Sequence, residues 1–244
     1  MEHRRRLTLS NLGVRGLYAR QNLLKENIPA ENIVVTGNTG IDLMTHTVRD
    51  DYTFENKDFA KLDFTEANFV IANSAKQRIV LMTAHRRENW GQPMESMFRA
   101  VRRLADDFVD ITIVYAVHPN PVVKDCAHKL LSKHPRIVLT DAVNVFDLHN
   151  MMSRSYLVLT DSGGIQEEAP ALNKPVVVMR GVTERPEGEA AGTLVLAGTD
   201  EARVYDTVKR LLTDSAEYQR MAEAPNPFGD GQASGRIVEA ILKW

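Results

Sequence analysis

Residues 157–170 read LVLTDSGGIQEEAP, and this stretch decides the fold. An apolar segment typical of a strand is followed by Ser162, Gly163 and Gly164, and then by a segment of helical character. Paired glycines let a backbone approach a ligand closely, and the first N–H groups of a helix favour negative charge. The stretch therefore predicts a strand, a phosphate-binding turn and a helix in succession. The alternative is an ordinary strand-to-helix turn, because short glycine motifs often occur without a ligand.

Apolar runs elsewhere in the chain extend this unit into a sheet. They are RIVLMTA (78–84), ITIVYAV (111–117), RIVLT (136–140), YLVLT (156–160) and PVVVM (175–179). Apolar runs without polar alternation are typical of strands covered on both faces, which indicates a parallel sheet. Apolar residues at helical spacing predict helices near residues 94–108, 121–133, 144–153, 164–172, 200–213 and 231–242. The fold class that follows is α/β, a doubly wound parallel sheet of the Rossmann type.

The first 77 residues have a different character. A helical segment at 17–26, a short IVVTG strand and a helix from Gly40 cannot bury a sheet face by themselves. A polar stretch then leads to the first long apolar run. We interpret residues 1–52 as the remnant of an N-terminal domain, 53–77 as a linker, and 78–244 as the main domain.

Composition limits the kinds of partner. With 30 Lys and Arg against 32 Asp and Glu, the net charge is −2, so the composition lacks the excess of positive charge that is typical of proteins that bind nucleic acid or a membrane surface. No segment approaches the roughly 18 apolar residues of a membrane-spanning helix, so we expect a soluble cytoplasmic protein. Cys126 stands alone, which excludes an internal disulfide, and the seven His residues lack metal-ligand spacing. Neither a metal nor a cofactor is expected.

Candidate site residues follow the ends of the predicted strands. In open parallel sheets, ligands bind beyond the carboxyl ends of the strands. His85 follows the first run beside Arg86 and Arg87, His118 follows the second run, and Arg185 lies after the fifth. An imidazole can donate to a phosphate oxygen or transfer a proton near neutral pH, and arginines can hold an anion. We therefore expect these side chains, His118 included, to meet a ligand at one edge of the sheet.

Each of these residues also has an interpretation without a ligand. His118 fits an ordinary hydrogen-bonded loop, and the charges at 86–88 fit a solvated helix entrance. Arg185 lies in TERPEGEAAGT, which could be a surface loop closed by weak ion pairs. Glu168 lies about one turn into the helix after the glycines. It could accept a hydrogen bond from a sugar hydroxyl, or it could be a surface carboxylate stabilised by the dipole at the helix N-terminus. Asp230 is expected to cap the final helix.

Seven motifs, in order, carry a family resemblance. They are TGNTGID, TAHRREN, VHPNP, LTDSGGIQEEAP, KPVVVMR, TERPEG and NPFGDGQAS, between residues 33 and 236. Together they resemble the non-hydrolysing UDP-N-acetylglucosamine 2-epimerases. The resemblance implies a two-domain glycosyltransferase-B-like architecture, with this chain as its C-terminal, nucleotide-binding half. It also implies an isomerase that forms UDP-N-acetylmannosamine, a cell-surface polysaccharide precursor, by eliminating UDP and adding it back.

The resemblance further implies roles for individual residues. Glu168 would accept from the ribose hydroxyls, and His85 would be the active-site histidine that assists the departure and return of UDP. A homodimer is possible on the same grounds. The diphosphate would be held by Ser162, Gly163, Gly164 and Arg185.

Two departures from the family pattern affect what we expect. Leu148 stands in DLHN where the family has a Phe against uracil, so Leu148 would pack on the base with stacking weaker by about 1 kcal/mol. The family's N-terminal domain, which supplies carboxylates for proton transfer at C2, is expected to be largely missing, so none is assigned. We therefore expect an epimerase that is incomplete in this chain. The alternatives are a non-catalytic UDP-sugar-binding module and a glycosyltransferase of the same architecture.

Overall fold

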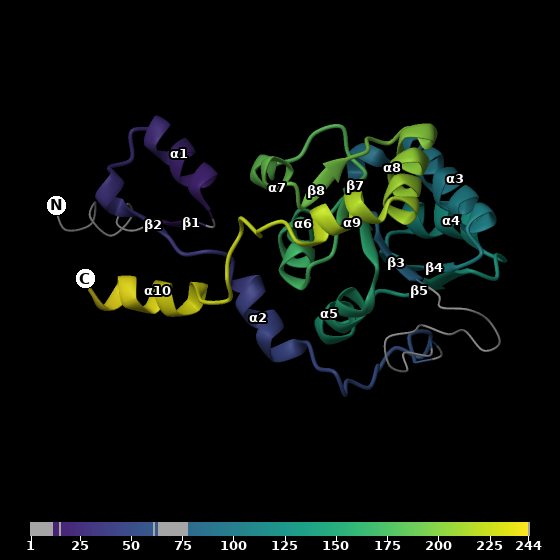
Figure 1. Ribbon diagram of the computed structural model, residues 1–244, viewed down its shortest axis with the longest axis horizontal. Coiled ribbons are helices and arrows are strands. Elements are labelled where there is room, and N and C mark those ends of the chain that lie inside the picture. Colours follow the sequence, from purple (N-terminus) through teal and green to yellow (C-terminus); the bar gives the residue numbers. More distant parts are fainter. Residues whose placement is uncertain (1–11, 15, 61, 63–77, 244) are drawn as a thin grey trace. The chain divides into compact units, whose positions relative to one another are not determined.

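The computed structural model describes residues 12–14, 16–60, 62 and 78–243. The chain forms two compact units, a smaller one of residues 1–46 and 226–244 and a larger one of residues 47–225 (Figure 1). The predicted division at residues 52 and 77 stays a prediction, and the part of the predicted linker at 63–77 lies outside the described residues. Within the described part of the chain, no helix is long and apolar enough to cross a bilayer.

A six-stranded parallel sheet forms the centre of the larger unit, with the strand order β5-β4-β3-β6-β7-β8. Its strands are β3 Arg78–Thr83, β4 Ile111–Ala116, β5 Ile137–Thr140, β6 Leu157–Thr160, β7 Val176–Val178 and β8 Leu194–Leu196. All five predicted runs form strands. Strand β8 is an addition to the predicted runs.

Helices connect the strands of this sheet. They are α3 Gln92–Asp107, α4 Pro121–Leu131, α5 Val145–Arg154, α6 Gly163–Glu168, α7 Pro186–Ala191, α8 Glu201–Thr213 and α9 Ser215–Ala222, with the 3-10 turns η3 Arg87–Asn89 and η4 Ala169–Leu172. The predicted helices of this unit are confirmed, the fourth as α6 followed by η4. The expectation of a loop throughout TERPEGEAAGT was wrong, because Pro186 begins α7 at the first helical position, where proline is favourable.

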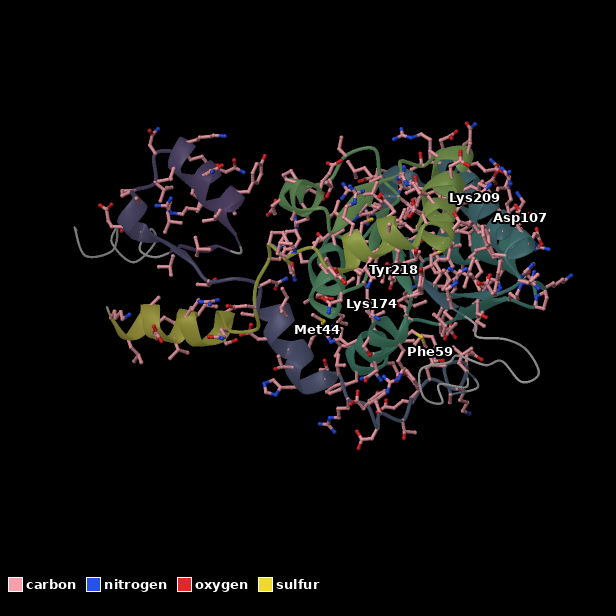
Figure 2. The ribbon with its side chains drawn as sticks, in the orientation of Figure 1. Met44, Phe59, Asp107, Lys174, Lys209 and Tyr218 are labelled. Carbon is pink, nitrogen blue, oxygen red and sulfur yellow. The ribbon has the colours of Figure 1, made fainter. Side chains whose placement is uncertain are left out.

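Both faces of the sheet are covered by helices (Figure 1). Val80 and Met82 pack in a core with α3, α4 and α8, whereas Ile79 and Leu81 pack in a second core with α5 and α6. This alternation is expected of a pleated strand buried on both sides. Phe59, labelled in Figure 2, is fully buried in the second core. The prediction of a doubly wound α/β sheet is therefore confirmed.

The described residues of the smaller unit form a short parallel pair of strands and three α-helices. These are β1 Leu12–Val14, β2 Ile33–Val35, α1 Leu17–Lys25, α2 Thr39–Thr47, whose last residue falls in the larger unit, and α10 Ala233–Leu242, with the 3-10 turn η2 Ala30–Asn32. Gly229 has φ +150°, and a β-carbon there would lie 3.2 Å from the backbone nitrogen of Asn38. Only a glycine fits this close approach of two backbone segments.

The capping of α10 differs from the prediction. Asp42 in α2 accepts from the backbone N–H groups of Ala233 at 3.0 Å and Ser234 at 2.6 Å, so it satisfies the first turn of α10. Asp230 instead forms a bidentate ion pair with Arg236, at 2.7 Å for each bond, which lowers the pKa of Asp230 to about 2. Asp230, the aspartate nearest to α10 in sequence, thus pairs with Arg236, and Asp42 from α2 caps the helix instead.

Candidate functional site

The strand order creates a switch point between β3 and β6. The chain leaves β3 toward β4 and β5 on one side, and continues from β6 to β7 and β8 on the other, the 3-2-1-4-5-6 order of Rossmann sheets. Loops beyond such a switch point diverge and leave a crevice at the carboxyl edge. His85 follows β3 and Ser162 follows β6. The topology therefore places two of the predicted residues at the same crevice.

Asp161 ties these two loops together. Its side chain is fully buried and accepts from the backbone N–H of His85, at 3.1 and 3.0 Å to its two oxygens. It also accepts from the backbone N–H of Arg86 at 2.9 Å and from Asn89 Nδ2 at 3.0 Å. A buried carboxylate is tolerated when several donors satisfy it, and here all of them come from one loop. Sequence reasoning placed Asp161 at a strand end but missed this role, since its partners lie about 75 residues away.

His85 and His118 meet at this edge, as predicted. Their rings stack with centroids 5.2 Å apart and planes 20° from parallel. Burial lowers the pKa of His85 below its ordinary value; Asp161, 3.7 Å from Nδ1, acts against this, while His118 and Arg86 reinforce it. Burial thus favours the neutral form of the His85 imidazole. A cavity of about 480 Å³ opens here, lined by His85, Arg86, Arg87, Glu88, Trp90, His118 and Asn120.

Two guanidinium groups converge on the glycine turn. A β-carbon at Gly163 would lie 3.4 Å from Arg185 Nη2 and 3.5 Å from Arg86 Nη2. Ser162 is the N-cap of α6, but its N–H already donates to Thr160 Oγ1 at 2.9 Å. The amides of Gly163 and the next residue are therefore the candidate anion donors, because they begin the helix.

The neighbouring arginines are not equivalent. Arg86 Nε donates to the backbone oxygen of Asp161 at 3.2 Å, which directs its other end toward the turn. Arg87 is exposed and its guanidinium lies over the Trp90 ring, 6.0 Å from the centroid. The two arginines of this charge cluster thus differ: Arg86 is directed toward the glycine turn, whereas Arg87 lies on the solvated surface.

Arg185 is held in place from α6. Its Nε donates to Glu167, whose side chain is fully buried, and its backbone N–H donates to Thr183 Oγ1 at 3.0 Å. The Thr183 hydroxyl in turn donates to Gln166 Oε1 at 2.5 Å. These bonds fix the loop after β7 against the helix that follows the glycines. Sequence reasoning missed the roles of Glu167 and Gln166. Glu167 cannot be distinguished from the adjacent Glu168 in the sequence, because only the structure shows which of the two carboxylates is buried.

Glu168 and Leu148 lie farther along α6 and α5. A β-carbon at Gly164 would lie 3.8 Å from Glu168 Oε1, so this carboxylate is near the second glycine. Its other oxygen is 3.6 Å from Nε2 of the buried His149, whose Nδ1 is 2.7 Å from Thr47 Oγ1. Leu148 is partly buried against the second core. The proposed contacts of Glu168 with ribose and of Leu148 with a base stay predictions.

The donor set is cationic and imidazole-rich. Among the described residues, no three His, Cys, Asp or Glu side chains gather so as to hold a metal ion. The fold and this edge together define a Rossmann-type α/β domain in which two guanidinium groups meet the start of a helix at the switch point.

The chain belongs to the UDP-N-acetylglucosamine 2-epimerase family, whose model matches residues 15–242. It is 51% identical over 224 residues to the UDP-N-acetylglucosamine 2-epimerase of Bacillus subtilis, covering 92% of this chain and 55% of that protein. The structure of S. aureus MnaA with UDP matches with a TM-score of 0.85 at 47% identity, over 95% of this chain and 60% of that one. The Neisseria meningitidis UDP-GlcNAc 2-epimerase bound to UDP-GlcNAc matches with a TM-score of 0.85 at 35% identity, over 95% and 61%.

These matches confirm the family resemblance and the fold class found in the sequence. The chain spans little more than half the length of these relatives, between 55% and 61%. It corresponds to the C-terminal half of their glycosyltransferase-B-like architecture.

Proposed function

We propose that this chain binds the UDP part of UDP-N-acetylglucosamine at the rim beyond β3, β6 and β7, and serves the 2-epimerisation of that sugar nucleotide. The observation that carries the proposal is the approach of Arg86 and Arg185 to Gly163 at the start of α6. Two cations and a helix N-terminus meet there with no side chain between them, which suits a diphosphate. The relatives solved with UDP and with UDP-GlcNAc support the choice of ligand.

The same groups suit the departure of UDP. Breaking the bond between the sugar C1 and the phosphate oxygen places growing negative charge on the diphosphate. Arginines already anchored in position stabilise that charge without reorganising, which is the most effective form of electrostatic catalysis. His85, whose backbone is held by Asp161, can donate a hydrogen bond to the leaving oxygen.

A non-catalytic UDP-sugar-binding chain is the second candidate, and the carboxylates around the rim favour it. Elimination needs a base to remove the C2 proton. Asp161 is surrounded by donors, Glu167 is paired with Arg185, and Glu88 lies 2.9 Å from Arg180 Nη2. Each of these three is engaged in holding the site together. These three carboxylates are therefore not free to act as that base. The predicted homodimer and the cytoplasmic location stay predictions.

Calorimetric titration with UDP tests the proposal. Arg86→Ala and Arg185→Ala should each weaken UDP binding about ten- to a hundredfold, the size of one lost charge-assisted hydrogen bond. Arg220→Ala serves as the control, because Arg220 is exposed in α9 and pairs with Glu217. UDP affinity that is unaffected by both rim variants would refute the assignment.

Turnover separates the two candidates. Proton NMR of UDP-N-acetylglucosamine with this chain in D₂O would show UDP-N-acetylmannosamine and deuterium at C2 if the chain is a complete catalyst. UDP binding without either product, at enzyme concentrations near those of the substrate, would favour the non-catalytic candidate.

A further inference from the structure

Arg180, at the end of β7, is almost completely buried and joins two loops. The residue is 6% exposed. Its Nη1 and Nη2 donate to the two carboxylate oxygens of Glu184 at 2.5 and 3.0 Å, and Nη2 is also 2.9 Å from Glu88 Oε1. One guanidinium therefore holds a carboxylate from the loop after β3 and a carboxylate from the loop after β7. The fork of Glu184 with Arg180 is a bidentate pair, which fixes orientation as well as distance.

These two loops are the ones that carry the rim arginines. Glu88 lies two residues after Arg86, and Glu184 immediately precedes Arg185. Arg86 and Arg185 both approach Gly163, where their like charges repel each other until an anion binds. A link between their loops would oppose that repulsion and keep both side chains at the turn.

The bonding of Arg180 suits positioning better than stability. Its Nε is buried and without a hydrogen-bond partner in the part of the chain that the structure describes. A buried, unsatisfied donor lowers stability, as does the removal of a guanidinium from water. Its two partners are half-exposed, with side-chain exposures of 52% for Glu88 and 50% for Glu184, so solvent screens their attraction to Arg180.

We infer that Arg180 is a positioning residue that sets the separation of Arg86 and Arg185 for a diphosphate, through Glu88 and Glu184. The inference rests on the proposed function, since it assigns Arg180 to the same anion site. Arg180 itself need not touch the ligand.

Glu184→Gln provides the sharpest test, because positioning and simple electrostatics predict opposite results. The substitution removes a negative charge next to Arg185, so a purely electrostatic influence would tighten UDP binding. It also breaks the bidentate fork, so positioning predicts binding about tenfold weaker. The pair Arg180→Gln with Glu184→Gln preserves net charge, and we expect UDP affinity to stay as low as in Arg180→Gln.

Arg78→Gln is the matched control. Arg78 is a partly buried arginine that bonds Asp110 at 2.6 Å and the backbone oxygen of Leu212 at 2.7 Å, at the opposite end of the sheet. We expect it to change stability without changing UDP affinity. Arg180→Lys keeps the positive charge but cannot form the bidentate pair with Glu184. Its affinity for UDP should therefore lie between those of Arg180→Gln and the wild-type chain.

A double-mutant cycle and arginine NMR complete the test. In an Arg185→Ala background, Arg180→Gln should weaken UDP binding less than in the wild-type chain, because one of the two guanidinium groups that Arg180 positions is already absent. Tighter binding in Glu184→Gln, or the same loss in both backgrounds, would overturn the inference. In the unliganded protein, the Nε–Hε signals of Arg86 and Arg185 should shift in Arg180→Gln and stay in place in Arg78→Gln. Unmoved signals in Arg180→Gln would overturn the inference. Because this measurement needs no ligand, it tests the inference separately from UDP binding and from the proposed function.

Discussion

Replacing Gly163 by alanine should raise stability and lower UDP affinity at the same time. Gly163 is the first residue of α6, and its φ lies outside the left-handed region. The added β-carbon would lie 3.4 Å from Arg185 Nη2 and 3.5 Å from Arg86 Nη2, which is ordinary van der Waals contact. The methyl group therefore fits the unliganded protein. Alanine also restricts the unfolded chain more than glycine, so we expect stability to rise by about 0.5 kcal/mol.

The effect on the ligand has the opposite sign. A phosphate oxygen that bonds both the helix amides and the guanidinium groups must approach each nitrogen to about 2.8 Å. The methyl group would occupy the space between those donors, which costs one or two charge-assisted hydrogen bonds of about 1.5–3 kcal/mol each. For one bond this corresponds to UDP binding about ten- to a hundredfold weaker.

Calorimetry with UDP and urea unfolding of the same preparation measure both quantities. Gly181→Ala is the control, because a β-carbon at that position meets no heavy atom within 4 Å. It should leave UDP affinity unchanged. If Gly163→Ala were more stable yet bound UDP within twofold of the wild-type chain, no phosphate would approach this glycine and the placement of the diphosphate would be wrong.

Three other substitutions test neighbouring parts of the site. Asp161→Asn should lower the free energy of unfolding by about 2–3 kcal/mol, because an amide nitrogen would face N–H donors in a buried position. Asp141→Asn, in an exposed pair with Lys124, should lower it much less, and equal losses in urea unfolding would contradict this account. Burial lowers the pKa of free His85 and a bound diphosphate would raise it, so UDP binding should take up a proton and strengthen as pH falls from the bound pKa toward the free one. Calorimetry in buffers of different ionisation enthalpy measures this uptake, and an unchanged uptake in His85→Gln would assign it to the ligand alone. Leu148→Phe should tighten UDP binding about fivefold through about 1 kcal/mol of added stacking and leave pyrophosphate binding unchanged; equal UDP affinity would remove Leu148 from the base site.

The sheet was predictable because its strands are buried on both faces. Val80 and Leu81 face different cores, so both must be apolar. The run 78–84 therefore lacks the alternation of polar and apolar residues that is typical of a strand with one exposed face. The order of the strands was not predictable in the same way. Local pattern identifies each strand, but the switch point between β3 and β6 depends on which helix crosses which face.

The site was predictable at the residues that end strands and less so at those that hold them. His85 lies just after β3 and Arg185 lies in the loop after β7, so the topology brings both to one edge of the sheet. The anchors Asp161, Glu167 and Arg180 are recognised by burial and by partners distant in sequence, which local pattern does not contain. An arginine in KPVVVMR looks like any charge after a strand until Glu88 and its neighbours are placed around it.

Arg86 and Arg185 are each anchored through their own Nε atom. This leaves the Nη2 atom of each free to face Gly163, where no side chain stands in the way. Arg185 donates from Nε to Glu167, and Arg86 donates from Nε to the backbone oxygen of Asp161. In each case the inner nitrogen is held and Nη2 is directed at Gly163. Lysine has no second nitrogen with which to do both, so it would be either anchored or available to the ligand. Because the anchors exist before a ligand arrives, the donors need not reorganise as charge grows on a departing diphosphate, and their contribution should be larger in the transition state than in binding.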